Sequence, residues 1–354
     1  MLVIVNRIKS YSFLPAMLLL LINTCLHAAP VPEPPLVAAN GHLLVDFDSN
    51  RVLSEENADK RLEPASLTKI MTSYIAEQEI AAGRLSPEDQ VLVSVNAWRT
   101  GGSKMFIREG TQVSVEDLLH GIIIQSGNDA SVAIAEHIGG SESAFANMMN
   151  QQAARLGMRN THFMNSTGLP NSEHYSSAWD LALLTRDLIE RYPEHYALYS
   201  QRSFEYNDID QPNRNKLFWR DRTVDGVKTG YTSDAGYCLV ASAVRQGMRL
   251  ISVVMGTDSD AARMLESQKL LSYGFRYFET QELYEAQVPL KEQALYYGQA
   301  DTVSLGVTDD VVITFPRGYY KDIEAELMVP KIVEAPLAVG QEVGEIRLRL
   351  HGET

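Results

Sequence analysis

Ser66 and Lys69 are the two residues with the clearest capacity for chemistry. They lie three positions apart in Pro64-Ala65-Ser66-Leu67-Thr68-Lys69. Because three residues make just under one helical turn, both side chains lie on one face of a helix and can meet. A serine hydroxyl is a weak nucleophile until a base takes its proton, and a neutral lysine amine can act as that base. The pair therefore predicts acyl transfer through a serine nucleophile.

Two further segments carry polar residues that suit the same site. Ser126-Gly127-Asn128 interrupts two apolar helical patterns, where polar side chains must find partners or do chemistry. Lys228-Thr229-Gly230 lies in a strand-like run and supplies a second lysine. Each segment alone is a weak signal, and Ser94-Val95-Asn96 repeats the Ser-x-Asn pattern elsewhere. Taken one at a time, the segments are explained without a function, as a surface lysine, a plain loop and an edge strand. The occurrence of all three segments in this order is much more specific.

The predicted elements place these segments at a helix start, in a loop between helices and on a strand. Pro64 suits the entry of a helix that runs from Ser66 to about Gly83. The other predicted helices span residues 115–123, 129–138, 142–156, 177–191 and 259–278. The predicted strands span residues 42–48, 51–54, 224–230, 236–245 and 248–256, with shorter ones in 91–107 and after Pro193. This order predicts an α+β fold with an antiparallel sheet flanked by helices and an inserted helical cluster.

The first 29 residues have the pattern of a secretory signal peptide. Arg7 and Lys9 give a basic start, and residues 14–22 form an apolar run that is short for a membrane span. Small residues suitable for cleavage follow. An uncleaved anchor and a lipoprotein signal are the alternatives. The proline-rich residues 30–36 predict an extended leader, and the whole pattern predicts export to the periplasm.

Two folded regions are expected after this leader. Residues 37–280 contain all three polar segments and form the predicted α+β domain. Residues 281–354 carry short alternating apolar runs separated by turn residues, which predicts a small all-β domain. Cys238 lies in an apolar strand-like run and is expected to be a buried structural thiol rather than a nucleophile.

The composition argues against several other classes of protein. The formal net charge is −14 and there is no run of Lys or Arg, so nucleic acid is not an expected partner. The eight histidines lack the paired spacing of zinc sites, and no Walker A or dinucleotide-binding glycine motif occurs. We therefore expect neither a metal ion nor another cofactor.

The three segments together resemble the motifs of active-site serine penicillin-binding proteins and class A β-lactamases. In particular, the chain resembles the low-molecular-mass penicillin-binding proteins that are bacterial D-alanyl-D-alanine carboxypeptidases. The resemblance runs from about Gly41 to Leu350 and includes Asn160-Thr161-His162-Phe163 and Asn213-Arg214-Asn215. It implies a penicillin-binding/β-lactamase-like transpeptidase domain, followed by that family's β-rich C-terminal domain. It also implies removal of the terminal D-alanine from peptidoglycan stem pentapeptides, and covalent binding of β-lactam antibiotics.

The resemblance implies the following catalytic roles. Ser66 would be the nucleophile that forms an acyl-enzyme, and Lys69 would be its general base. Burial and the charge of nearby Lys228 would lower the pKa of Lys69, and Lys228 would also add positive potential. Ser126 would relay the proton to the leaving amine, and Asn128 would hold the substrate amide.

The resemblance also implies a set of substrate contacts. Backbone N–H groups, one of them from the nucleophilic serine, would form the oxyanion hole. Hydroxyl and guanidinium groups would bind the terminal carboxylate, because a charge-assisted contact suits them. The residues expected in this set are Thr229, Gly230, Tyr231 (through its backbone N–H), Arg263 and Arg214.

The sequence departs from the family's pattern in two places. Close relatives have histidine where this chain has Tyr231, so the side-chain effect on deacylation differs while the backbone donor is kept. The sequence after Leu350 shows no amphipathic helix of the kind that anchors membrane-bound members, so association with the inner membrane is not expected by that route. The alternatives are a D,D-endopeptidase, a β-lactamase, and a non-catalytic penicillin-binding scaffold whose β domain contacts the membrane or a cell-wall protein.

Overall fold

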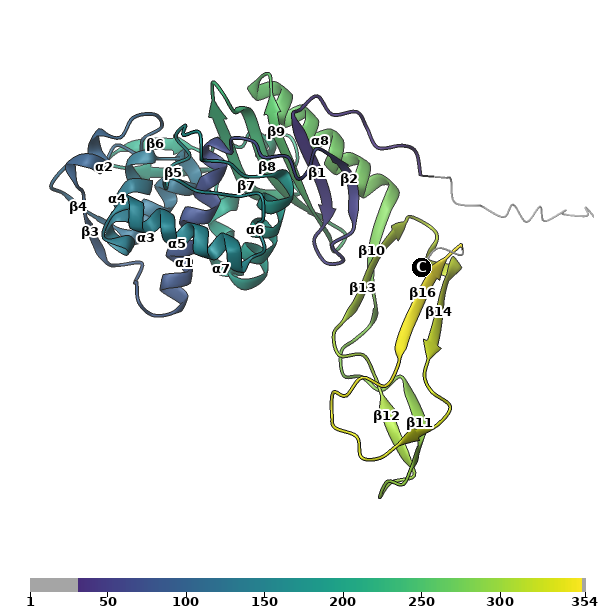
Figure 1. Cartoon of the computed structure of the whole chain (residues 1–354). Helices are drawn as coiled ribbons and strands as arrows, with labels where there is room; N and C mark the ends of the chain where they lie inside the picture. The colour runs from purple at the N-terminus through teal and green to yellow at the C-terminus, as the bar shows by residue number, and fades with distance from the viewer. Residues whose placement is uncertain (1–30, 352–354) are drawn as a thin grey trace, which may run out of the picture. The chain divides into compact units, whose positions relative to one another are not determined.

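The structure is a computed structural model that describes residues 31–351, and the statements below concern that part of the chain. Its centre is a five-stranded antiparallel sheet in the order β2-β1-β9-β8-β7. These strands are β1 (Gly41–Asp46), β2 (Val52–Glu56), β7 (Val224–Thr232), β8 (Gly236–Arg245) and β9 (Met248–Thr257). Because β1 pairs with β9, the first hairpin completes a sheet built mainly by later strands (Figure 1). The predicted central strands are confirmed.

Helices cover both faces of this sheet. Leu250 and Val254 of β9 belong to the core cluster that includes apolar residues of α8 (Asp260–Tyr277). Ile251 and Val253 belong to the other core cluster, which includes α1 (Lys69–Ala81) and α6 (Ala178–Arg191). Successive side chains of a strand point to opposite faces, so a strand covered on both sides is apolar at consecutive positions. This explains the continuous apolar runs that predicted β8 and β9.

A cluster of helices is inserted in the sequence between β2 and β7. The elements are the 3₁₀ turn η1 (Ala65–Thr68), α1, α2 (Val95–Arg99), α3 (Val115–His120), the π-helical turn η2 (Gly121–Gln125), α4 (Asn128–Gly139), α5 (Glu142–Arg155) and α6. The short strands β3 (Gln90–Leu92) and β4 (Gln112–Ser114) pair beside them. Apolar residues of α3, η2 and α4 share one core cluster, which confirms the helical patterns on either side of Ser126.

The strand predicted after Pro193 is wrong at its beginning. The chain forms α7 (Pro193–Tyr196) and the 3₁₀ turn η3 (Ala197–Ser200) before the hairpin β5 (Ser203–Tyr206) and β6 (Ile209–Pro212). Pro193 fits the first helical turn because its missing N–H would have no partner there. Tyr196 and Tyr199 are buried and stack with ring centroids 5.5 Å apart. Their spacing of three residues puts both rings on one helical face.

Two other local predictions need correction. Ser66 lies in the 3₁₀ turn η1, and the α-helix begins only at Lys69. Residues 95–99 form the short helix α2 rather than a strand, because Ser94 Oγ accepts a hydrogen bond from the Ala97 N–H at 3.0 Å and caps it.

The C-terminal region is built from short strands. β10 (Phe278–Tyr284) pairs with β13 (Val311–Pro316), β11 (Lys291–Tyr296) pairs with β12 (Thr302–Leu305) and β15 (Val333–Glu334), and β14 (Ile323–Met328) pairs with β16 (Glu345–Leu350). The predicted β-rich character of this region is confirmed. Within residues 31–351, no helix is both long and apolar enough to cross a bilayer.

Candidate active site

Lys69 begins α1, and its amine contacts the nearby Ser66 and two segments that are distant in the sequence. Lys69 Nζ donates to Ser66 Oγ at 3.0 Å, to Asn128 Oδ1 at 2.7 Å and to the Thr167 carbonyl at 2.6 Å. The side chain is only 1% exposed. Because η1 leads directly into α1, Ser66 and Lys69 lie on the same face, as their spacing predicts.

The protonation state of Lys69 suits proton transfer near neutral pH. Burial lowers the pKa of Lys69 to about 7, and the charge of Arg214 adds to this effect. The Asp129 carboxylate acts in the opposite direction and raises the pKa. An amine with a pKa near 7 is substantially neutral at physiological pH, so it can accept the hydroxyl proton of the adjacent serine.

The turn that carries Ser66 is enclosed by two glycine-containing segments. A Cβ on Gly168 would lie 1.8 Å from the Ala65 carbonyl oxygen, and Gly168 has a φ of +82°. A Cβ on Gly230 would lie 2.9 Å from the Pro64 carbonyl oxygen. Both segments therefore approach the backbone of the turn more closely than any residue with a side chain could. Gly168 follows Thr167, so this close approach also brings the Thr167 carbonyl to Lys69.

Ser126 ends the π-helical turn η2 in a left-handed conformation, with a φ of +65°. The side chain is buried, and Ser126 Oγ has no hydrogen-bond partner among the described residues. A left-handed non-glycine residue and an unpaired buried hydroxyl both cost free energy, and π-helical turns occur frequently at functional sites. All three features mark Ser126 as a residue held in place for a function other than stability.

Lys228 is the second buried lysine of the site. It lies in β7, is 2% exposed, and donates from Nζ to the Thr229 carbonyl at 3.1 Å. Burial holds the pKa of Lys228 well below its usual value, and the charges of Lys69, Arg214 and Arg263 lower it further. The sequence predicts that burial and the charge of Lys228 lower the Lys69 pKa. In the structure burial is the main cause, and the charge that adds to it is that of Arg214.

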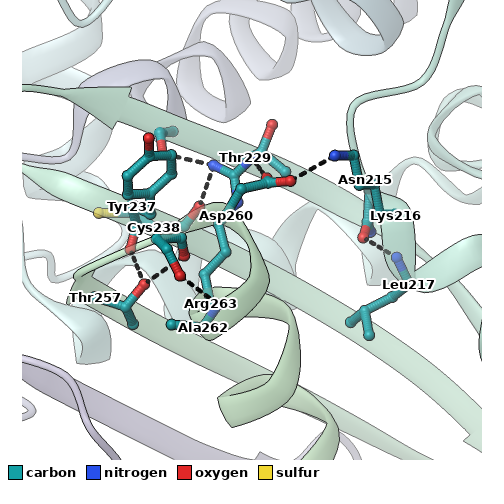
Figure 2. A network of polar contacts seen from close by, with 12 residues as sticks. Asn215, Lys216, Leu217, Thr229, Tyr237, Cys238, Thr257, Asp260, Ala262 and Arg263 are labelled. Atoms are coloured by element: carbon teal, nitrogen blue, oxygen red, sulfur yellow. Dashed lines mark hydrogen bonds and ion pairs between the residues drawn. The ribbon is translucent and has the colours of Figure 1, made fainter.

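Arg263 extends from α8 to the strands beside Lys228. Its Nη1 donates to the Gly230 carbonyl at 2.8 Å and to the Cys238 carbonyl at 3.3 Å, and Nη2 forms an ion pair with Asp260. Figure 2 shows this network together with Thr229. Most of the guanidinium is therefore engaged by the protein. Cys238 is fully buried, as the sequence predicts.

Arg214 and Tyr231 are the more accessible of the predicted binding residues. Arg214 Nε donates to the Gln125 carbonyl at 3.0 Å, directly before Ser126. The Tyr231 side chain is 53% exposed and packs on Tyr237 with ring centroids 4.2 Å apart.

The structure thus brings the predicted residues to one region, and it adds others that the sequence did not indicate. Ser66, Lys69 and Asn128 are joined by direct hydrogen bonds, and Arg263 bonds to Gly230. The additional contacts are the carbonyls of Gly101, Ser103 and Thr167 and the carboxylate of Asp129. A backbone carbonyl has no residue-specific signature, so only the adjacent Thr167-Gly168 turn could have suggested one of them.

Comparisons with known proteins cover both regions of the chain. A family model described as D-alanyl-D-alanine carboxypeptidase matches residues 28–259, and one described as penicillin-binding protein 5, C-terminal domain, matches residues 278–354. The D-alanyl-D-alanine carboxypeptidase DacC of Escherichia coli is 44% identical over 348 residues, which is 96% of this chain and 87% of that protein.

Two solved structures illustrate the structural similarity. Penicillin-binding protein 5 from Haemophilus influenzae has a TM-score of 0.88 and 44% identity, over 91% of this chain and 95% of that one. Penicillin-binding protein D2 from Listeria monocytogenes, in its ampicillin-bound form, has a TM-score of 0.64 and 30% identity, over 68% of this chain and 100% of that one.

Proposed function

Because the chain belongs to the D-alanyl-D-alanine carboxypeptidase family and is a serine-type enzyme of that kind, we propose that Ser66 is its nucleophile. The observation that carries this proposal is the hydrogen bond of 3.0 Å between Ser66 Oγ and Lys69 Nζ, in a site that holds the lysine pKa near 7. A nucleophile and a poised base within hydrogen-bond distance are what acyl transfer requires.

The Ser66–Lys69 hydrogen bond supports the following acylation step. Ser66 Oγ attacks the carbonyl carbon between the two terminal D-alanines, and its proton passes to Lys69 Nζ. Backbone N–H groups of Ser66 and Tyr231 stabilise the oxyanion. The C–N bond then breaks, and Ser126 relays the proton from Lys69 to the departing amine. This role gives the unpaired Ser126 hydroxyl a partner. Water later hydrolyses the ester and releases the shortened peptide.

The terminal carboxylate of the substrate needs a cationic subsite. We assign this subsite to Thr229, Gly230 and Arg214. Arg214 supplies its positive charge, and Lys228 adds positive potential. Arg263 already donates to Gly230 and Cys238 and pairs with Asp260, so its main contribution is to hold the strand that presents Thr229. Asn128 supports the substrate amide through Oδ1, which also accepts from Lys69.

β-Lactams are expected to acylate the same serine. The Listeria protein D2, which is 30% identical to this chain, has been solved with ampicillin bound. A β-lactam presents a reactive carbonyl and a carboxylate in an arrangement similar to that of the terminal dipeptide, so the subsites proposed above fit both ligands. The adduct is expected to hydrolyse more slowly than the peptide acyl-enzyme.

The wider organisation is also a proposal. We assign the peptidase domain to residues 37–280 and the β-rich domain to residues 281–354. The proposed signal peptide, residues 1–29, lies outside the residues that the structure describes, and export to the periplasm rests on its sequence pattern. The β-rich domain is expected to provide contacts to the membrane surface or to a cell-wall protein.

Release of D-alanine from a stem pentapeptide tests the function directly. We expect stoichiometric release of one D-alanine per peptide by the wild-type chain. Rapid penicillin hydrolysis without D-alanine release would identify a β-lactamase instead, and faster cleavage of cross-linked dimers would identify an endopeptidase. A penicillin adduct without turnover of any peptide would indicate a non-catalytic binding protein.

The two Ser-x-Asn segments provide a matched test of the proton relay. We expect Ser126→Ala to lower the acylation rate by about 10²-fold with the fold intact, because the leaving amine loses its proton donor. Ser94→Ala removes the cap of α2 and is expected to cost about 1 kcal/mol of unfolding free energy while leaving acylation unchanged. Equal acylation rates for Ser126→Ala and the wild type would remove Ser126 from the mechanism.

A further inference from the structure

Asp129 is a buried carboxylate that the acylation steps do not use. It lies in the first turn of α4 and is fully buried. Its Oδ1 accepts hydrogen bonds from the N–H groups of Met105 and Ala130, both at 3.0 Å. Its Oδ2 accepts from Phe106 N–H at 2.9 Å and Ile107 N–H at 3.3 Å. Four backbone donors compensate for burying the charge, and three of them come from one segment.

That segment, which we call the rim segment (residues 101–107), also contacts Asn128. The Ser103 carbonyl accepts from the Asn128 N–H at 2.7 Å, and the Gly101 carbonyl accepts from Asn128 Nδ2 at 2.7 Å. The other end of the same amide, Oδ1, accepts from Lys69 Nζ. The rim segment therefore fixes the orientation of the Asn128 side-chain amide.

Local sequence makes this arrangement depend on the carboxylate. Phe106 has a φ of +71° and is half exposed, so the rim segment is held in a conformation that a non-glycine residue rarely adopts. A Cβ on Gly127 would lie 2.9 Å from Asp129 Oδ1 and 3.1 Å from the Met105 nitrogen. Only glycine at position 127 leaves room for the carboxylate to meet the rim segment.

We propose that Asp129 is a positioning residue for acylation: by holding residues 105–107 it fixes the Gly101 and Ser103 carbonyls, and through them the Asn128 amide that contacts Lys69. The inference rests on the proposed function of the site. It extends that function from the residues of the three motifs to the segment that surrounds them.

The charge of Asp129 gives this role a signature in the pH profile. Lys69 is faced by the charges of Arg214 and Asp129, and it interacts in turn with Lys228 and His174. Among these, the Asp129 carboxylate raises the pKa of Lys69. Removing its charge without changing its shape should therefore lower the Lys69 pKa, and the pH at which acylation reaches half of its plateau should move downward.

Asp129→Asn removes the charge of Asp129 and keeps its shape. It also replaces one acceptor oxygen by an NH₂ group that faces backbone donors. We expect the plateau rate of acylation by a fluorescent penicillin to fall by about 10- to 100-fold, as for a small misplacement of a reacting group. We also expect the midpoint of the pH profile to move to lower pH.

Asp180→Asn is the control, since Asp180 is equally buried and accepts hydrogen bonds from Asn160 N–H and Thr161 Oγ1, both at 2.7 Å. It should lower the thermal midpoint and leave the acylation rate and pH profile unchanged.

A second pair of variants perturbs the rim segment without touching Asp129. A Cβ on Gly102 would lie 2.6 Å from Asn128 Nδ2, whereas a Cβ on Gly110 meets nothing within 4 Å. Both glycines are exposed and have positive φ values of 86° and 75°. Backbone strain is thus similar, and only Gly102→Ala should slow acylation, again by about tenfold or more.

Wild-type acylation rates in Asp129→Asn, or equal rates in Gly102→Ala and Gly110→Ala, would overturn the positioning role. With either result, the wild-type chain would still release D-alanine. Failure of the proposed function would appear differently, as a wild-type chain that releases no D-alanine.

Discussion

Ser66→Ala is expected to abolish the penicillin adduct and to lower D-alanine release by a factor on the order of 10⁴ or more. Alanine removes the only atom that can form the acyl bond, while the packing of η1 is kept because the Ser66 hydroxyl contacts only Lys69 Nζ among its hydrogen-bond partners in the described residues. Intact-protein mass spectrometry after penicillin treatment measures the adduct, and peptide mapping should place it on Ser66 in the wild type.

Ser73 supplies the control for this experiment. It lies seven residues further along, is fully buried in α1, and contacts the Ile70 carbonyl and the Tyr199 hydroxyl. Ser73→Ala should lower the unfolding free energy by about 1 kcal/mol and keep a full adduct. An undiminished adduct in Ser66→Ala would contradict the assignment of the nucleophile.

Lys69 is expected to set the pH dependence of acylation. Its pKa of about 7 means that the neutral amine is the major form only above that pH, so the rate should rise through about pH 7 and level off above it. Lys69→Met and Lys69→Arg should each lose about 10³-fold, because neither side chain can accept the proton at these pH values. The measurement is the second-order rate of acylation between pH 5 and 10, made on folded protein.

The same shift of the Lys69 pKa makes the free energy of unfolding depend on pH. The unfolded chain binds a proton at Lys69 up to its usual pKa of 10.5, whereas the folded chain releases it near 7. The free energy of unfolding should therefore rise with pH across that window, and Lys69→Met should remove this rise. Lys60→Met, at an exposed lysine nearby in the sequence, should change neither the rate nor the pH profile. A wild-type rate that is flat from pH 5 to 10 would contradict the role of Lys69 as base.

The spacing of apolar residues predicted those helices and strands whose buried positions follow a regular pattern. Ile251 and Val253 face one core and Leu250 and Val254 the other, so β9 stands out as a continuous apolar run. Helices α5 and α6 carry apolar residues on helical spacing and begin at serine caps. The prediction failed after Pro193, where Tyr196 and Tyr199 suit a strand by residue type and a helix by spacing.

The sequence motifs indicated side chains that the structure places in contact, such as Ser66, Lys69 and Asn128, but not the backbone groups that support them. Serine, lysine and asparagine side chains have chemistry that their motifs reveal. The carbonyl of Thr167 contacts Lys69 because Gly168 lets the backbone approach, and no residue type encodes that position. Burial was predicted as a cause of the lowered Lys69 pKa, but the contribution of Arg214 was not, because its approach to Lys69 depends on tertiary packing rather than on spacing.

The contacts of Lys69 have a practical consequence for detecting this protein. Its amine is held by Ser66, Asn128 and Thr167, which converge only when α1, α4 and the loop before α6 have all packed. In an unfolded chain that amine keeps its usual pKa and stays charged, and the serine has no activating base. A fluorescent penicillin should therefore label native molecules and not unfolded ones, which makes acylation a ready assay of conformational quality during expression, storage or mutational scanning.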